Sequence, residues 1–228
     1  MVTAAAVYGR LLAHYGRQRW WPAETPFEVV VGALLMQQTA WANVERAIAH
    51  LRQDGLMDAH ALAAASVPRI RKAIAVAGLY RTKPARLKAF CRHLVDQADG
   101  DLMRFFHRPT AALRTELLAQ PGVGPEIADS LLLYAGRHLV FVVDAYTIRI
   151  GTRLGLFTTT AYDDVQRFFE THVPRRVAGY REYHALLVRH AKTFCRRQPR
   201  CASCPLRRMC DYPRRERSRA THAVAPAS

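Results

Sequence analysis

Helical periodicity runs through almost the whole chain and limits it to one fold class. Apolar residues recur every three or four positions in nine stretches, which proline- or glycine-bearing turns separate. This period places the apolar side chains of each stretch on one helix face, so the chain is predicted to be all-α. The predicted helices cover residues 4–15, 27–36, 41–51, 67–76, 84–98, 111–118, 125–135, 162–172 and 180–194.

One short segment departs from this period. Residues 139–143 read Leu-Val-Phe-Val-Val, an apolar run with the character of a strand. The sequence offers no second strand to pair with it, so its backbone groups need other partners. We therefore predict a buried extended segment that leads into a helix over 145–154, starting near Asp144.

Length and composition fit a protein with a full core. The chain has 228 residues, half of them apolar, which suffices for one domain or two closely packed lobes without disulfides. Residues 1–16 mix small, apolar and basic side chains, unlike a signal peptide or a membrane span, so a cytoplasmic protein is expected. Residues 213–228 are rich in Arg, then Ala, Pro and Ser, and are predicted to be disordered.

The charge is strongly basic. Against 18 Asp and Glu there are 34 Lys and Arg, a formal net charge of +16, and the excess gathers toward the C-terminus. Such clustering favours a polyanionic partner over an evenly solvated basic surface. A membrane surface is the weaker alternative, because no lipidation or hydrophobic signal accompanies the charge.

A glycine turn opens one of the predicted helices. The sequence Pro121-Gly122-Val123-Gly124 precedes the helix at 125–135. Glycines permit a tight turn whose backbone N–H groups can face an anion such as a DNA phosphate. An ordinary turn between packed helices is the alternative, and glycine spacing alone favours it.

Four of the five cysteines lie within sixteen residues, in the pattern C-x5-C-x2-C-x5-C. In a reducing compartment this pattern predicts a metal or iron–sulfur site rather than disulfides. Zinc sites usually use two close pairs and this chain has one, so an iron–sulfur cluster is at least as compatible. The fifth cysteine, Cys91, is predicted to be a buried packing residue. The four candidate ligands are Cys195, Cys201, Cys204 and Cys210.

Taken together, four motifs resemble a known family. They are the stretch at 26–39, the glycine turn with its flanking helices at 117–130, Val-Val-Asp-Ala-Tyr-Thr-Ile-Arg at 142–149, and the four cysteines. In this order and spacing they resemble the helix-hairpin-helix DNA glycosylases of the endonuclease III superfamily. The branch they most resemble is that of the monofunctional 3-methyladenine glycosylases.

The resemblance implies a two-lobed, all-α fold. A central domain at 23–135 would end in the hairpin, and residues 1–22 with 136–212 would form a second lobe around a [4Fe-4S] cluster held by the four cysteines. The family usually places six residues between its first two cysteines and this chain has five, which indicates a shorter loop. The implied partner is double-stranded DNA with damaged bases, bound by a monomer without a membrane, and hairpin carbonyls could share a monovalent cation.

Asp144 is the catalytic residue that the resemblance implies. Breaking the bond between sugar and base creates an oxocarbenium-like state, which a nearby carboxylate stabilises while it can also activate water. A helix N-cap is the alternative role for this residue, and both can hold at once.

Two absences narrow the implied reaction. Bifunctional members carry a lysine that forms a Schiff base, and Glu126 stands at that position, so strand nicking is not expected. Members that remove adenine carry a glutamate that protonates the leaving base, and Ala33 stands there. An alkylated, already cationic purine such as 3-methyladenine needs no such acid.

Aromatic residues at family-like positions suit that substrate. An indole attracts a cationic purine by a cation–π interaction worth roughly 0.5–2 kcal/mol. Packing where the lobes meet is the alternative role for any single tryptophan. The implied pocket residues are Trp20, Trp21, Pro22 and Trp41.

The resemblance also implies contacts to DNA. Gln38 would fill the gap left by a flipped base, whereas Gln37 could equally be a capping or buried amide. Lys83 and Lys192 are expected to be solvated surface residues. The backbone of the hairpin and the arginines of the cysteine loop would bind phosphates, through Gly122, Val123, Gly124, Arg196, Arg197 and Arg200.

Two further functions remain open at this point. One is a glycosylase for oxidised or deaminated pyrimidines that works without the hairpin lysine. The other is a non-catalytic protein that binds lesions or DNA structures, against which the retained Asp144 argues.

Overall fold

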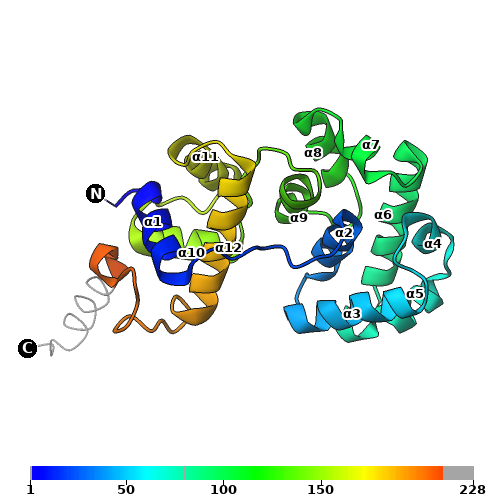
Figure 1. Cartoon of the computed structure of the whole chain (residues 1–228), viewed down its shortest axis with the longest axis horizontal. Coiled ribbons are helices and arrows are strands. Elements are labelled where there is room, and N and C mark those ends of the chain that lie inside the picture. The colour runs from blue at the N-terminus through cyan, green and yellow to red at the C-terminus, as the bar shows by residue number, and fades with distance from the viewer. Residues whose placement is uncertain (1, 80, 213–228) are drawn as a thin grey trace, which may run out of the picture. The chain divides into compact units, whose positions relative to one another are not determined.

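The computed structural model describes residues 2–79 and 81–212, and in these ranges the chain is helical without strands (Figure 1). This confirms the all-α prediction; the predicted disordered tail lies outside the described residues. Among the described residues, no helix is both long and apolar enough to cross a membrane. The described part of the chain holds twelve α-helices: α1 Ala4–Tyr15, α2 Pro26–Leu35, α3 Trp41–Gln53, α4 Ala59–Ala64, α5 Val67–Ile74, α6 Lys83–Ala98, α7 Leu102–Phe106, α8 Thr110–Leu118, α9 Pro125–Ser130, α10 Ala145–Leu154, α11 Tyr162–His172 and α12 Val177–Thr193.

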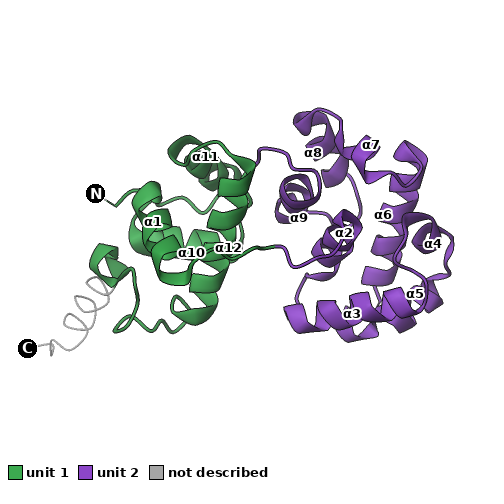
Figure 2. Cartoon of the chain, viewed as in Figure 1, with its two compact units in different colours: residues 1–20, 141–228 green, residues 21–140 purple. Residues whose placement is uncertain are grey.

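The chain forms two compact units (Figure 2). Unit 1 combines residues 1–20 with 141–228, and unit 2 is the continuous stretch 21–140. Unit 1 therefore joins the N-terminal helix α1 to α10, α11 and α12, and α1 packs on both α11 and α12.

In unit 2 the central helix is α2. Eight of its ten residues are buried, and it packs against α3, α6 and α9. Its start is fixed by Thr25, whose hydroxyl accepts a hydrogen bond from the Glu28 N–H at 3.2 Å, and by Pro26 in the first turn. A helix buried on nearly every face can place its residues with little freedom.

One predicted helix changes its winding. The helix expected over 125–135 is α9 only as far as Ser130, and a π-helical turn covers Leu131–Ala135. Its wider ring is visible in the bond from the Gly136 N–H to the Leu131 carbonyl at 2.9 Å. A Cβ on Gly136 would lie 2.6 Å from Phe106, so close packing of α7 against this turn requires the glycine.

The predicted extended segment is confirmed over residues 140–143, which are buried without helical or strand structure, whereas Leu139 is half-buried in a bend. Side chains of α11 supply backbone partners for this segment. The Phe141 N–H donates to Glu170 at 2.9 Å, and its carbonyl accepts from Gln166 at 2.7 Å. The Phe141 ring stacks on Phe169 with centroids 4.4 Å apart. These contacts set where α10 begins.

Candidate active site

Asp144 is the N-cap of α10. Its backbone is extended, and its Oδ1 accepts a hydrogen bond from the Thr147 N–H at 2.6 Å. The residue is 8% exposed. The capping role is thus observed, and it holds the carboxylate at the positive end of the α10 dipole.

The Asp144 carboxylate has a second neighbour, His184 of α12. The His184 Nε2 lies 3.5 Å from Asp144 Oδ2, and both side chains are buried. Burial by itself would raise the pKa of Asp144, but His184 and the Thr147 N–H favour the ionised form, and the pKa is lowered. His184 was not predicted, although it lies on the apolar stripe of α12 with Tyr180, Tyr183 and Leu187. A histidine within such a stripe is the signal that could have found it.

The glycine turn in unit 2 is fixed by side chains from two other segments. Gly122 has φ +78°, a backbone conformation that favours glycine. Its carbonyl accepts from Gln37 Nε2 at 2.7 Å, and Arg86 donates to Gln37 Oε1 at 3.1 Å. Gly124 is the N-cap of α9, and Val123 is buried beneath the turn. Gln37 therefore has the predicted amide role, directed at the turn itself.

Lys83 corrects one prediction. It is 1% exposed rather than solvated, and its ammonium donates to the carbonyls of Gln37 and Ala77, both at 2.7 Å. Burial lowers its pKa. Because Gln37 lies in the turn before α3 and Ala77 in the 3-10 turn Ala75–Ala77 that follows α5, the lysine ties these two segments together. Lys192 is exposed, as predicted.

The two helices that flank the turn are joined by a buried ion pair. Arg114 of α8 donates from Nε and Nη2 to the two carboxylate oxygens of Asp129 in α9, at 2.8 and 3.2 Å. Asp129 is fully buried. Glu126 is exposed in the first turn of α9. It stands at the position where the family resemblance implies a lysine in bifunctional members.

Two of the predicted aromatic residues meet in unit 2. The rings of Trp21 and Trp41 lie edge to face with centroids 5.5 Å apart, and Tyr134 joins Trp21 at 5.3 Å. Gly32 of α2 makes room for them, since a Cβ there would lie 3.2 Å from the Trp21 indole nitrogen. Tyr134 was not predicted, because it falls within the buried π turn.

The other residues predicted at this site differ in exposure. Ala33 is buried in α2, whereas Pro22 and Gln38 are exposed. Gln38 has φ +51°, so the chain turns sharply there. Trp20 is half-buried and belongs to unit 1.

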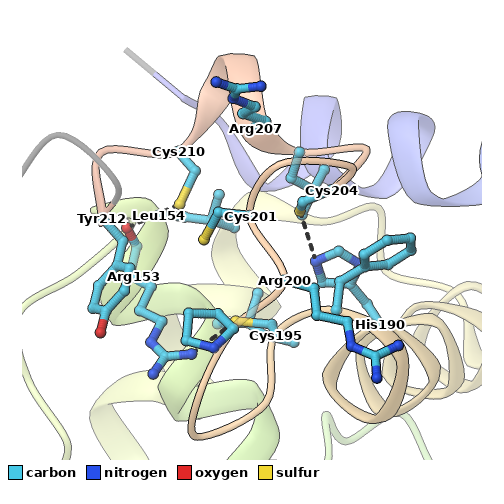
Figure 3. A pocket seen from close by; sticks show the side chains of 14 residues that line it. Arg153, Leu154, His190, Cys195, Arg200, Cys201, Cys204, Arg207, Cys210 and Tyr212 are labelled. Atoms are coloured by element: carbon cyan, nitrogen blue, oxygen red, sulfur yellow. Dashed lines mark hydrogen bonds between the residues drawn. The ribbon is translucent and has the colours of Figure 1, made fainter. Parts of the chain in front are cut away.

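The four C-terminal cysteines line one pocket in unit 1 (Figure 3). All four are free thiols and none is fully exposed. Within residues 2–79 and 81–212, no three His, Cys, Asp or Glu side chains converge as a single metal ion would require. Four thiols that line one pocket are compatible with a cluster in which each thiolate binds a different iron.

Polar contacts within this pocket involve buried groups. Cys204 Sγ lies 3.6 Å from His190 Nε2, and a hydrogen bond of 3.1 Å joins His190 Nδ1 to the Tyr15 hydroxyl. Burial raises the pKa of Cys204 to about 11; the Leu206 N–H acts in the opposite direction, and the neighbouring thiols raise the pKa as well. Burial raises the pKa of Cys210 as well. Thiolates so placed need a cationic group among them, which iron ions supply.

The later turns of helix α10, away from Asp144, hold the cysteine loop. Arg149 donates to the Cys195 carbonyl at 2.9 Å, and Arg153 donates to the carbonyls of Arg196 and Arg197 at 2.6 and 3.1 Å. The same helix thus carries Asp144 at its start and the contacts to the loop in its last turns. The side chains of Arg196, Arg197 and Arg200 are exposed, and with Gln198 they line a surface hollow.

Comparisons with known proteins agree on one family. The model of the HhH-GPD superfamily of base excision DNA repair proteins matches residues 31–175. A protein of Methanocaldococcus jannaschii, provisionally named a DNA repair glycosylase, is 44% identical over 90% of this chain and 94% of its own length.

Solved structures show the same fold. Endonuclease III in a non-covalent complex with DNA superposes with a TM-score of 0.80 at 22% identity, covering 96% of this chain and all of that one. The 3-methyladenine DNA glycosylase of H. pylori, bound to 1,N6-ethenoadenine, has a TM-score of 0.76 at 23% identity and covers 84% of this chain and 98% of its own. The fold is therefore endonuclease III-like.

Proposed function

Because the chain belongs to the HhH-GPD superfamily of base excision DNA repair proteins, we propose that it is a monofunctional DNA glycosylase for alkylated purines of the 3-methyladenine type. Membership of the superfamily makes it a DNA repair glycosylase that acts in base excision repair. The proposed substrate class depends on which side chains this chain carries and which it lacks.

Asp144 is the proposed catalytic carboxylate. The pKa of its carboxyl lies below the ordinary value, so it is ionised at neutral pH. Because it is buried, little water screens its negative charge, which would stabilise the positive charge that develops on the sugar. The same carboxylate would accept a proton from the attacking water.

The residues at two other positions select the reaction. Glu126 is a carboxylate, which forms no Schiff base with the sugar, so the enzyme would release the base and leave the strand intact. Ala33 offers no acid to protonate a leaving base. A purine that alkylation has made cationic leaves as a neutral base and needs none.

The aromatic residues support a cationic purine as the ligand. Trp21, Trp41 and Tyr134 lie together in unit 2. Electron-rich rings attract a cation, and each cation–π contact is worth roughly 0.5–2 kcal/mol. Trp20 and Pro22 are the remaining proposed pocket residues. A hydrogen bond of 2.7 Å from the Trp41 indole N–H to Glu45 fixes the orientation of that ring.

DNA would be bound mainly through its phosphates. The N–H groups of Gly122 and Gly124, with Val123 packed below, form the proposed hairpin site, where turn carbonyls would share a monovalent cation. The exposed Arg196, Arg197 and Arg200 would contact further phosphates, as positioning rather than base-reading contacts. Gln38, exposed on a sharp turn, is the proposed wedge behind the flipped base. 

A [4Fe-4S] cluster is the proposed cofactor. Cys195, Cys201, Cys204 and Cys210 would hold it, since their thiols line one pocket. A bound cluster would crosslink the cysteine loop and keep its arginines in place, a structural rather than a catalytic role.

The observation that carries this proposal is a buried, ionised Asp144 in a chain with Glu126 at the lysine position. The test is base release from duplexes that each hold one lesion: alkylated purines, oxidised pyrimidines, uracil, or adenine opposite 8-oxoguanine. We expect release of alkylated purine, strand breaks only after alkali, and loss of all but a residual single-turnover release in Asp144→Asn, with DNA binding retained. Glu126→Lys should add strand breaks without alkali. Breaks without alkali in the wild type would contradict the monofunctional assignment.

A glycosylase for deaminated or oxidised pyrimidines is the second candidate. The missing acid at Ala33 favours it too, because uracil leaves as an anion that its two carbonyl groups stabilise. The lesion panel separates the two functions directly, since release of uracil or an oxidised pyrimidine in preference to alkylated purine supports this candidate.

A further inference from the structure

Asp144 is held from two different helices. Within α10, its Oδ1 accepts from the Thr147 N–H at 2.6 Å. Its other oxygen, Oδ2, lies 3.5 Å from Nε2 of His184 in α12. Helices α10 and α12 pack against each other, and the two side chains are only 8% and 5% exposed. Each carboxylate oxygen thus faces a group of a different helix: the Thr147 N–H at Oδ1 and, at ion-pair distance, the His184 imidazole at Oδ2.

This double contact bears on how the carboxylate can turn. The torsion that rotates a carboxylate about its Cβ–Cγ bond is broad, so a contact at one oxygen leaves much of that freedom. A second contact, at Oδ2, restricts that rotation. A carboxylate fixed before the reaction does not have to reorganise when positive charge develops in front of it.

We propose that His184 is a positioning residue for Asp144: its Nε2–H fixes Oδ2, so that the carboxylate stays ionised and in one orientation during base release. The inference rests on the proposed catalytic role of Asp144. His184 itself would touch neither the sugar nor the base.

A packing role alone does not account for the histidine. Its position lies on the stripe that α12 turns to the core, beside Tyr180, Tyr183 and Leu187. An aliphatic side chain there would avoid the cost of burying an imidazole. The lowered pKa of Asp144, despite burial that would raise it, is the effect expected of a donor at this place.

The first test is a mutant cycle in the full chain, measured as single-turnover release of the preferred base. His184→Ala should slow release about 10- to 100-fold, as loss of a hydrogen bond to a charged group does. His184→Gln, which keeps an N–H donor, should stay within about 3-fold of wild type. In Asp144→Asn, the added His184→Ala change should cost nothing further, because a positioning residue acts only through its partner.

A matched control is Tyr183→Phe. This neighbour on α12 is equally buried and loses one hydrogen bond, from its hydroxyl to the Ala4 carbonyl at 2.9 Å. It should lower stability without slowing base release. Equal slowing in Tyr183→Phe and His184→Ala, or an additive loss in the Asp144→Asn background, would overturn the proposal.

The second test does not depend on the substrate. The carboxyl carbon of Asp144 is followed by NMR through an acid titration, in wild type, His184→Gln and His184→Ala, with thermal unfolding to show that each variant is folded. The pKa of Asp144 should rise in His184→Ala and remain low in His184→Gln. If the wild type releases no alkylated purine but this rise is seen, the proposed substrate fails and the positioning role stands. An unchanged pKa together with unchanged release overturns the positioning role alone.

Discussion

The glycine turn of unit 2 and the cysteine loop of unit 1 are the two proposed phosphate-binding segments, and they are held in different ways. The turn at 121–124 is fixed by the chain's own hydrogen bonds, from Gln37 to Gly122 and from Lys83 and Arg86 to Gln37. The loop at 195–210 is tied to α10 by arginines, but four thiols line its interior, and burial raises the pKa of Cys204 and Cys210. The first segment is complete as a protein structure, and the second would be completed by the proposed cluster.

The largest expected difference follows removal of the cluster. Cys204→Ala, or chelation of iron, should abolish the visible absorbance and the amide exchange protection of residues 195–210. Protection of the glycine turn should not change, because its partners all belong to unit 2. Hydrogen exchange measures both segments in one sample, with iron and sulfide analysis alongside. One zinc and no sulfide in the purified protein would contradict the cluster.

The second-largest effect is expected from breaking the ion pair beside the turn. Arg114→Ala removes the guanidinium from the fully buried Asp129 carboxylate, which should lower the free energy of unfolding by about 3–5 kcal/mol. Urea unfolding measures it. Arg114→Ala with Asp129→Ala should recover part of the loss, because no buried charge then lacks its partner. The visible absorbance of the cluster should survive both changes in the native protein.

The two glycines of the turn should differ. In Gly122→Ala, a φ of +78° and a Cβ that would lie 2.5 Å from Arg86 should cost about 1–2 kcal/mol and weaken DNA binding. Gly124→Ser is the matched control, because its Cβ meets nothing within 4 Å and serine suits an N-cap. Unfolding and DNA titrations should separate the pair. Equal losses in both would mean that the turn is not held as described.

The smallest effect is the response to acid. Each unit has a carboxyl with a lowered pKa: Asp144 in unit 1, and Glu116 of α8 in unit 2, which Arg108 and His93 stabilise against burial. Each such group adds stability above its ordinary pKa of about 4, and that stability is lost as the pH falls through the lowered value. Asp144→Asn and Glu116→Gln should each flatten the fall in unfolding free energy below about pH 4. If the unfolding free energy of either variant falls as steeply with acid as that of the wild type, that residue does not contribute to the acid response.

The sequence predicted the elements whose signal is contained in their own residues. Periodicity found every helix of eight or more residues except α10, which was predicted from Asp144 and the extended run before it. It missed α4 and α7, which have six and five residues, whereas the six-residue α9 was found because the π-helical turn continues its repeat. Asp144 as the start of α10 and the extended run before it were predicted because cap and helix are adjacent. The catalytic role of Asp144, the binding roles of the other site residues, and the predicted domain boundaries at 22/23 and 135/136 stay predictions.

Contacts between distant residues escaped prediction. Lys83 looked like a surface lysine because its acceptors, the carbonyls of Gln37 and Ala77, carry no sequence signature. Forty residues separate Asp144 from His184, so only the packing of α10 on α12 brings them together. Backbone acceptors and long-range partners depend on the tertiary fold, which a local pattern does not encode.

The composition of unit 1 from both ends of the chain has a consequence for synthesis. Tyr183 donates to the carbonyl of Ala4, and Arg10 donates to the carbonyl of Pro205, so α1 finds its first partners only after α12 has been made and its last one with the cysteine loop. Unit 2 is continuous in sequence, so it can fold on the ribosome before the partners of α1 have been made. Closing contacts this far apart is slow, and α1 exposes apolar side chains until then. The contact between Asp144 and His184, which needs α12, is therefore made in a chain that already carries its glycine turn.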